Sequence, residues 1–97
     1  MSVMVLVQGN PDPKKAETLQ KYQQTARTII GKYGGEVLAR GGGIGKLHGS
    51  KDYQVGIVIR FPDKVAVDSW YNDSDYQAVV PLRNDAYMEL EITMFQE

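Results

Sequence analysis

Apolar side chains stand on both faces of two stretches of the chain, Ser2 to Gln8 and Tyr53 to Phe61. In both stretches every odd-numbered position is apolar, and the centre of each also has an apolar even-numbered residue, such as Leu6 or Val58. A strand with this pattern must be covered on both faces, so it belongs in the middle of a sheet. The pattern therefore predicts two central strands.

Two other stretches predict strands with one polar face. Glu36 to Arg40 is short and more polar than the first strand, and Tyr87 to Phe95 alternates throughout. In the second of these stretches, the inward residues are Met88, Leu90, Ile92 and Met94, and the outward ones are Glu89, Glu91 and Thr93. Such alternation is typical of strands that have one face in solvent.

Helical spacing appears between these strands. Asp12 followed by Pro13 predicts a helix start, and Gly34-Gly35 predicts its end. Between them, apolar residues recur every three or four positions, at Leu19, Tyr22, Ala26, Ile29, Ile30 and Tyr33.

A second, shorter helix should begin at Asp63, which is a favourable N-cap residue. Ser74 and Gln77 have the spacing of a capping box, so a new helical turn is expected there. Because proline cannot donate a backbone hydrogen bond, Pro81 should limit that turn.

The predicted order β-α-β-β-α-β is the ferredoxin-like arrangement, an α+β fold with an antiparallel sheet. Its strand order 4-1-3-2 places the first and third strands in the centre, in agreement with their two apolar faces. We expect one domain, residues 1–97, with two helices on one face of the sheet. The other face would stay apolar and uncovered, which favours a homodimer packed sheet to sheet.

Composition excludes several classes of function. The net charge is −1 with no basic cluster, so we expect no nucleic-acid partner. The chain has no cysteine, which excludes disulfides and thiolate chemistry. It also has no apolar run near the ~20 residues of a membrane span. Its first residues lack the features of a secretion signal, so we expect a cytoplasmic, bacterial-type protein with no membrane association.

Two segments resemble a family of small bacterial proteins, a domain of unknown function within the dimeric α+β barrel superfamily. They are Lys32 to Gly42, and Phe61-Pro62 continuing through Trp70 to Gln77 and Leu82-Arg83. The resemblance covers nearly the whole chain and implies a ferredoxin-like protomer whose homodimer forms a barrel from two sheets. It implies little about chemistry, although related branches include cofactor-free oxygenases, lactone isomerases and haem-handling proteins.

The glycine run Gly41 to Gly45 and the single histidine offer little for known site types. A phosphate-binding loop would need glycine at Arg40 and serine or threonine at Leu47, so the run is interpreted as a loop at a pocket rim. A zinc or iron site needs more ligands than His48 alone, so we expect no metal and no cofactor. His48 is a candidate for a catalytic base.

Arginines and aromatic residues near strand ends are the stronger candidates. Arg40, Arg60 and Arg83 could each hold a carboxylate or enolate, or form an ordinary salt bridge. Trp70 and Tyr76 could line an apolar cavity or belong to the core, and Tyr76 is a second candidate for proton transfer. We interpret Arg40, Trp70, Tyr76 and Arg83 as the ligand-binding set.

The resulting hypothesis is a small homodimer that binds a small anionic or enolic organic molecule between sheet and helices. One alternative is a metal-free enzyme of the isomerase or cofactor-independent monooxygenase type. Another is a non-catalytic stress or regulatory dimer. The sequence contains no recognisable set of nucleophile, base and orienting residue that would favour the enzyme.

Overall fold

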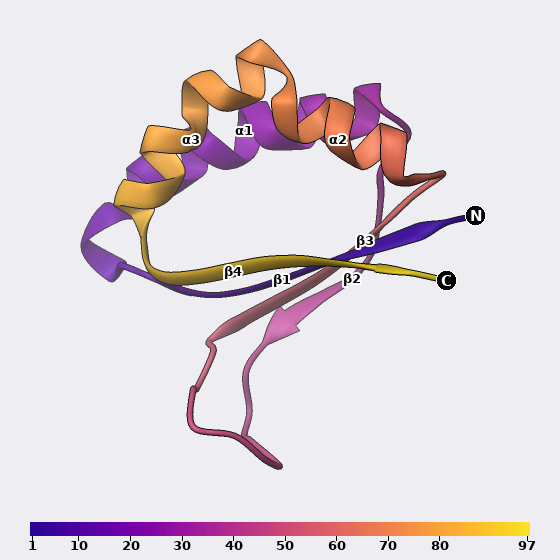
Figure 1. The fold of residues 1–97 in the computed structure, drawn as a ribbon. Coiled ribbons are helices and arrows are strands. Elements are labelled where there is room, and N and C mark those ends of the chain that lie inside the picture. The colour runs from indigo at the N-terminus through magenta and orange to yellow at the C-terminus, as the bar shows by residue number, and fades with distance from the viewer.

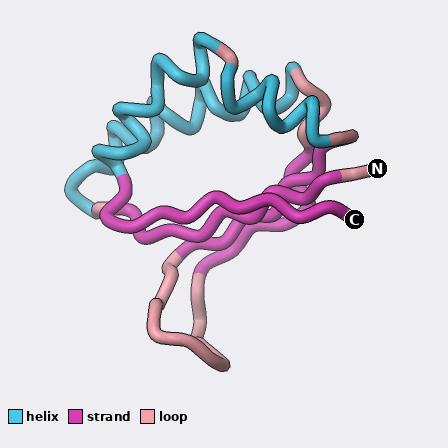
Figure 2. The backbone as a smooth tube through the Cα atoms, in the orientation of Figure 1, coloured by secondary structure: helices cyan, strands magenta, loops and turns pink.

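A four-stranded antiparallel sheet is covered on one face by helices, as Figures 1 and 2 show for the computed structural model of residues 1–97. The strand order is β2-β3-β1-β4, which confirms the predicted ferredoxin-like topology. The elements in chain order are β1 (Val3–Pro11), a 3-10 turn η1 (Pro13–Lys15), α1 (Ala16–Lys32), β2 (Glu36–Gly42), β3 (Val55–Phe61), α2 (Lys64–Asn72), α3 (Ser74–Ala86) and β4 (Tyr87–Gln96).

The core lies between the helices and the sheet face that carries the odd-numbered residues of β1 and β3. Nine buried residues form it: Val3, Val5, Ala26, Ile29, Ile59, Phe61, Val67, Trp70 and Tyr76. The longest helix, α1, ends where Gly34 adopts a φ of 79°, a conformation that glycine tolerates without strain. No helix combines the length and the hydropathy that crossing a membrane would require.

Three helices, rather than the predicted two, cover the sheet. The turn expected at Ser74 continues past Pro81 as the helix α3, so the prediction that Pro81 ends it was wrong. Proline has no backbone N–H, so Pro81 leaves the Gln77 carbonyl without its helical partner. Both residues are exposed, so this carbonyl can bind water. The helix continues past Pro81 because the burial of Tyr76 and Arg83 on the other side of α3 stabilises it.

The expected capping box is also replaced, because Asp73 rather than Ser74 caps α3. Its Oδ1 accepts hydrogen bonds from the backbone N–H groups of Asp75 at 2.8 Å and Tyr76 at 3.4 Å. Its Oδ2 accepts from the Tyr33 hydroxyl at 2.6 Å and from Lys32 Nζ at 3.3 Å. Asp73 thus joins the end of α1 to the start of α3.

These contacts make Asp73 a source of pH-dependent stability. The pKa of Asp73 is lowered from 3.8 to about 2, first by the hydrogen bond from Tyr33 and then by the backbone donors and Lys32, although burial opposes the shift. A carboxyl group with a lowered pKa in the folded state stabilises it above the unfolded value, and this contribution disappears as pH falls. The stabilisation should therefore be complete above about pH 4 and decline towards pH 2.

Replacing Asp73 with asparagine should lower the free energy of unfolding more at pH 5 than at pH 2.5. Asparagine still caps the helix, so the change removes mainly the charge. Urea unfolding at the two pH values measures this difference, with Asp68→Asn, an exposed carboxylate paired with Lys64, as the control. An equal loss of stability at both pH values would contradict the assignment.

Candidate functional site

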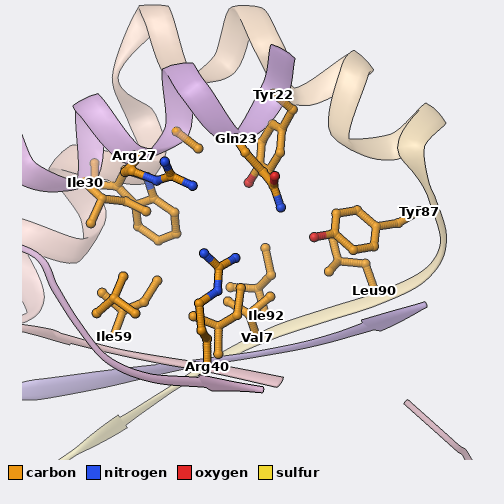
Figure 3. A pocket seen from close by; sticks show the side chains of 14 residues that line it. Val7, Tyr22, Gln23, Arg27, Ile30, Arg40, Ile59, Tyr87, Leu90 and Ile92 are labelled. Atoms are coloured by element: carbon orange, nitrogen blue, oxygen red, sulfur yellow. The ribbon is translucent and has the colours of Figure 1, made fainter. Parts of the chain in front are cut away.

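A cavity of about 80 Å³ lies between α1 and the helix-facing side of the sheet, and Figure 3 shows it. Eleven of its 14 lining residues are hydrophobic, so its walls suit an apolar group. The sheet contributes Val7, Ile57, Ile59, Leu90 and Ile92 to these walls. Polar side chains enter from α1, β2 and the first residue of β4.

Arg40 reaches this cavity because β2 contains a β-bulge. Val37 pairs with Ile59 and Arg40 pairs with Ile57, while the register shifts between Val37 and Ala39. Simple alternation would place Arg40 on the face opposite to Val37, but the extra residue turns it to the same face. Figure 3 shows the Arg40 side chain rising from β2 towards α1.

A second arginine enters from the opposite wall. Gln23 and Arg27 lie four residues apart on α1 and both extend into the cavity (Figure 3). The structure contains six salt bridges, and neither Arg27 nor Arg40 takes part in any of them. Both arginines are exposed, so they lie where the cavity opens to solvent. Two positive charges therefore share one apolar opening without a carboxylate.

Two tyrosines complete the polar lining. Tyr87 projects from the start of β4 with its hydroxyl group towards the cavity (Figure 3). Its ring packs on Gly9, where a Cβ would lie only 2.9 Å from ring atoms, so a side chain there would displace it. Burial raises the pKa of Tyr87, although the charge of Arg40 opposes this shift. Burial and the neighbouring Tyr76 also raise the pKa of Tyr22. Both groups are neutral hydroxyls at physiological pH.

Arg83 and Tyr76 lie behind the cavity wall rather than in it. Arg83 Nη1 donates hydrogen bonds to the hydroxyls of Tyr71 at 3.1 Å and Tyr76 at 3.3 Å, and the Tyr76 hydroxyl is 2.8 Å from that of Tyr22. Burial disfavours the charged form of Arg83, but these hydrogen bonds outweigh it and raise its pKa. Arg83 has no carboxylate partner, and Asn84 Oδ1 accepts from its Nε and Nη2 atoms.

Trp70 belongs to both the core and the cavity wall. It is 2% exposed and stacks on Phe61 with ring centroids 5.4 Å apart. Its indole Nε1 is the buried side-chain nitrogen without a hydrogen-bond partner. A buried donor of this kind costs free energy unless a ligand or water accepts its hydrogen bond.

The remaining candidates lie elsewhere. His48 is in the exposed segment 43–54 between β2 and β3, which extends away from the helices (Figure 1). Arg60 forms a salt bridge with Glu97, with Nε 2.7 Å from Oε1. The structure contains no group of three or more histidine, cysteine, aspartate or glutamate residues that could hold a metal ion.

Of the predicted ligand-binding set, the structure places Arg40 and Trp70 in the cavity lining and Tyr76 and Arg83 behind it. The cavity is also lined by four residues outside that predicted set, Tyr22, Gln23, Arg27 and Tyr87. Gln23 and Arg27 directly follow Tyr22 and Ala26 of the apolar stripe on α1. This position beside the stripe is the signal that could have identified them.

Comparison with known proteins is consistent with the fold. The model of the family described as "Domain of unknown function (DUF1330)" matches residues 5–95. No curated protein matches the chain. Among solved structures, a protein of unknown function from Rhodopseudomonas palustris has 17% identity and a TM-score of 0.86, over 99% of this chain and 82% of that one.

Two further structures have the same fold at low identity. A protein from Jannaschia sp. CCS1, described as dimeric, ferredoxin-like and of unknown function, has 14% identity and a TM-score of 0.78, with all of both chains covered. A dabb family protein with a ferredoxin-like fold from Mesorhizobium loti has 15% identity and a TM-score of 0.70, over 100% of this chain and 95% of that one. At these identities the comparison establishes the fold.

Proposed function

We propose that this chain, which belongs to the DUF1330 family, binds a small organic anion in the cavity between α1 and the sheet. The observation that carries this proposal is the pair Arg27 and Arg40, which enter one apolar cavity from opposite walls without any carboxylate partner. An anion between them would relieve their mutual repulsion and accept charge-assisted hydrogen bonds.

The size of the cavity limits the ligand. A cavity of about 150 Å³ holds a benzene molecule in a protein core. The cavity here is about 80 Å³, so its apolar part suits a chain of only a few carbon atoms. We therefore assign the ligand to the short-chain carboxylates or similarly small enolates, with the charged end at the arginines.

Sodium butyrate is a suitable probe, and 1-butanol is its neutral counterpart of the same chain length. At constant ionic strength, butyrate should shift the backbone amide signals of Gln23, Arg27 and Arg40 in a ¹⁵N–¹H spectrum, and 1-butanol should shift them far less. Replacing Arg40 with glutamine should weaken butyrate binding roughly tenfold, or about 1.4 kcal/mol. This value is low for a hydrogen bond to a charged group, because the exposed arginine is partly solvated.

Lys64→Gln is the matched control, because it removes one positive charge from an exposed site on α2 outside the cavity. It should leave the dissociation constant for butyrate unchanged. Equal weakening by Arg40→Gln and Lys64→Gln would indicate only a general charge effect and would contradict the proposed site. Absence of saturable butyrate binding to the wild-type protein would also contradict it.

We also propose that the protein is a homodimer packed through the uncovered sheet face. This face carries Met4, Leu6 and Val58 in its centre and Phe95 at its edge strand. Phe95 is 59% exposed in the protomer. Support comes from the Jannaschia structure, which is described as dimeric. Because the cavity lies on the other side of the sheet, each protomer would carry a complete ligand site.

A further inference from the structure

We propose that Tyr22 donates a hydrogen bond to the anion in the cavity, and that Arg83 and Tyr76 hold the Tyr22 hydroxyl in the orientation that makes this donation. This inference rests on the proposed ligand site and adds a specific donor to it. It follows from the direction in which hydrogen bonds must run through the Arg83–Tyr76–Tyr22 chain, of which Arg83 and Tyr76 are buried.

The direction of the chain begins at Arg83. A guanidinium group has donors only, so the 3.3 Å contact between Arg83 Nη1 and the Tyr76 hydroxyl makes Tyr76 an acceptor. Tyr76 is completely buried, and the only other partner of its hydroxyl is Tyr22, at 2.8 Å. The Tyr76 hydrogen is therefore satisfied only when it is donated to Tyr22.

The opposite direction would be unfavourable. If Tyr22 donated to Tyr76, the Tyr76 oxygen would accept two hydrogen bonds and its own hydrogen would have no partner. A buried donor without a partner costs about 1–3 kcal/mol. The chain thus runs from Arg83 to Tyr76 to Tyr22, and the charge on Arg83 polarises both hydroxyls in that direction.

The Tyr22 hydrogen is consequently free for a ligand. Its hydroxyl has no partner in the protein apart from Tyr76, and Tyr22 lines the same cavity as Arg27 and Arg40. Figure 3 shows the Tyr22 ring extending from α1 towards the cavity. Because burial raises its pKa, Tyr22 keeps this hydrogen throughout the physiological range.

The lining also restricts the chemical state of the ligand. None of the 14 lining residues is an aspartate, glutamate or histidine, so the cavity has no side chain suited to removing a proton at neutral pH. The arginines and Tyr22 together therefore suit a molecule that is already ionised when it enters. A carboxylate fits best, with its two oxygens shared between an arginine and the Tyr22 hydroxyl.

The first test is Tyr22→Phe in the butyrate titration. Phenylalanine keeps the ring, so the fold should be intact, and loss of the donor should weaken butyrate binding about five- to tenfold. Tyr33→Phe is the matched control, because it removes a hydroxyl at the C-terminal end of the same helix, where Tyr33 donates to Asp73 outside the cavity. Unchanged butyrate affinity in Tyr22→Phe would overturn the inference.

The second test concerns Arg83 as a positioning residue. Arg83→Met should weaken butyrate binding about two- to threefold in the wild-type background and have no further effect in Tyr22→Phe, because it acts through that hydroxyl. Arg83→Lys should retain most of the affinity, and Tyr76→Phe replaces Arg83→Met if the methionine variant does not fold. A loss of equal size in both backgrounds would overturn the positioning role.

These outcomes separate the inference from the proposed function. If butyrate binds in an Arg40-dependent way and Tyr22→Phe binds as well as the wild type, the ligand site stands and the Tyr22 assignment fails. If the wild-type protein does not bind butyrate at all, both fail.

Discussion

Replacing Trp70 with alanine should lower the free energy of unfolding by about 3–5 kcal/mol, the usual cost of emptying a large buried aromatic site. Trp70 is 2% exposed, stacks on Phe61, and has its ring centroid 5.0 Å from that of Tyr76 and 5.6 Å from that of Tyr71. The substitution therefore removes the centre of the contact between α2, α3 and the sheet. For a domain of this size the melting temperature should fall by at least about 12 °C.

Trp70→Phe separates the ring from the indole nitrogen. Phenylalanine keeps the aromatic packing and removes the buried N–H that has no partner, so its cost should stay below about 1.5 kcal/mol. Val65→Ala is the control on the same helix, since Val65 is 70% exposed and should change stability little. All variants must be compared at one protein concentration, because dimerisation would make stability depend on concentration. A loss below 1 kcal/mol for Trp70→Ala would contradict the core role.

Most of the fold could be predicted because it depends on local patterns. The two apolar faces of β1 and β3 indicate central strands, and the strand order β2-β3-β1-β4 agrees with that interpretation. The end of α3 could not be predicted in this way. Pro81 is a local stop signal, but the burial of Tyr76 and Arg83 against other elements outweighs it. That burial is a tertiary effect without a local sequence signature.

The candidate site was harder to predict from the sequence, because it too depends on tertiary contacts. Arg40 could be identified as a candidate, but its direction depends on a bulge that exists only in the pairing of β2 with β3. Arginine is a residue type suited to binding an anionic ligand. The packing of α3, however, brings Arg83 to Tyr71 and Tyr76 instead of the cavity surface. Which arginine meets a ligand is therefore decided by register and helix packing.

The uncovered sheet face should make the protein a dimer, with a mass in light scattering of twice the 10.8 kDa protomer at micromolar concentration. A stable interface of this kind buries well over ~1,000 Å² in total. The centre of the face is apolar at Leu6 and Val58, which are paired across β1 and β3. Ile44 and Leu47, both fully exposed, lie in the segment that projects beyond this face (Figure 1), so they would extend the apolar contact.

Replacing Leu6 with glutamate should convert this dimer to a monomer, because the interface would then bury a charge without a partner. Leu6 points away from the core that α1 and α2 cover, so the protomer should keep its fold, and near-ultraviolet circular dichroism of Trp70 would verify this. Gln20→Glu adds the same charge on the exposed side of α1 and should leave the dimer intact. The sheet face that carries Leu6 is the one that combines apolar strands with the absence of a covering layer. A wild-type mass of one protomer, or a Leu6→Glu variant that remains dimeric, would therefore contradict sheet-to-sheet association.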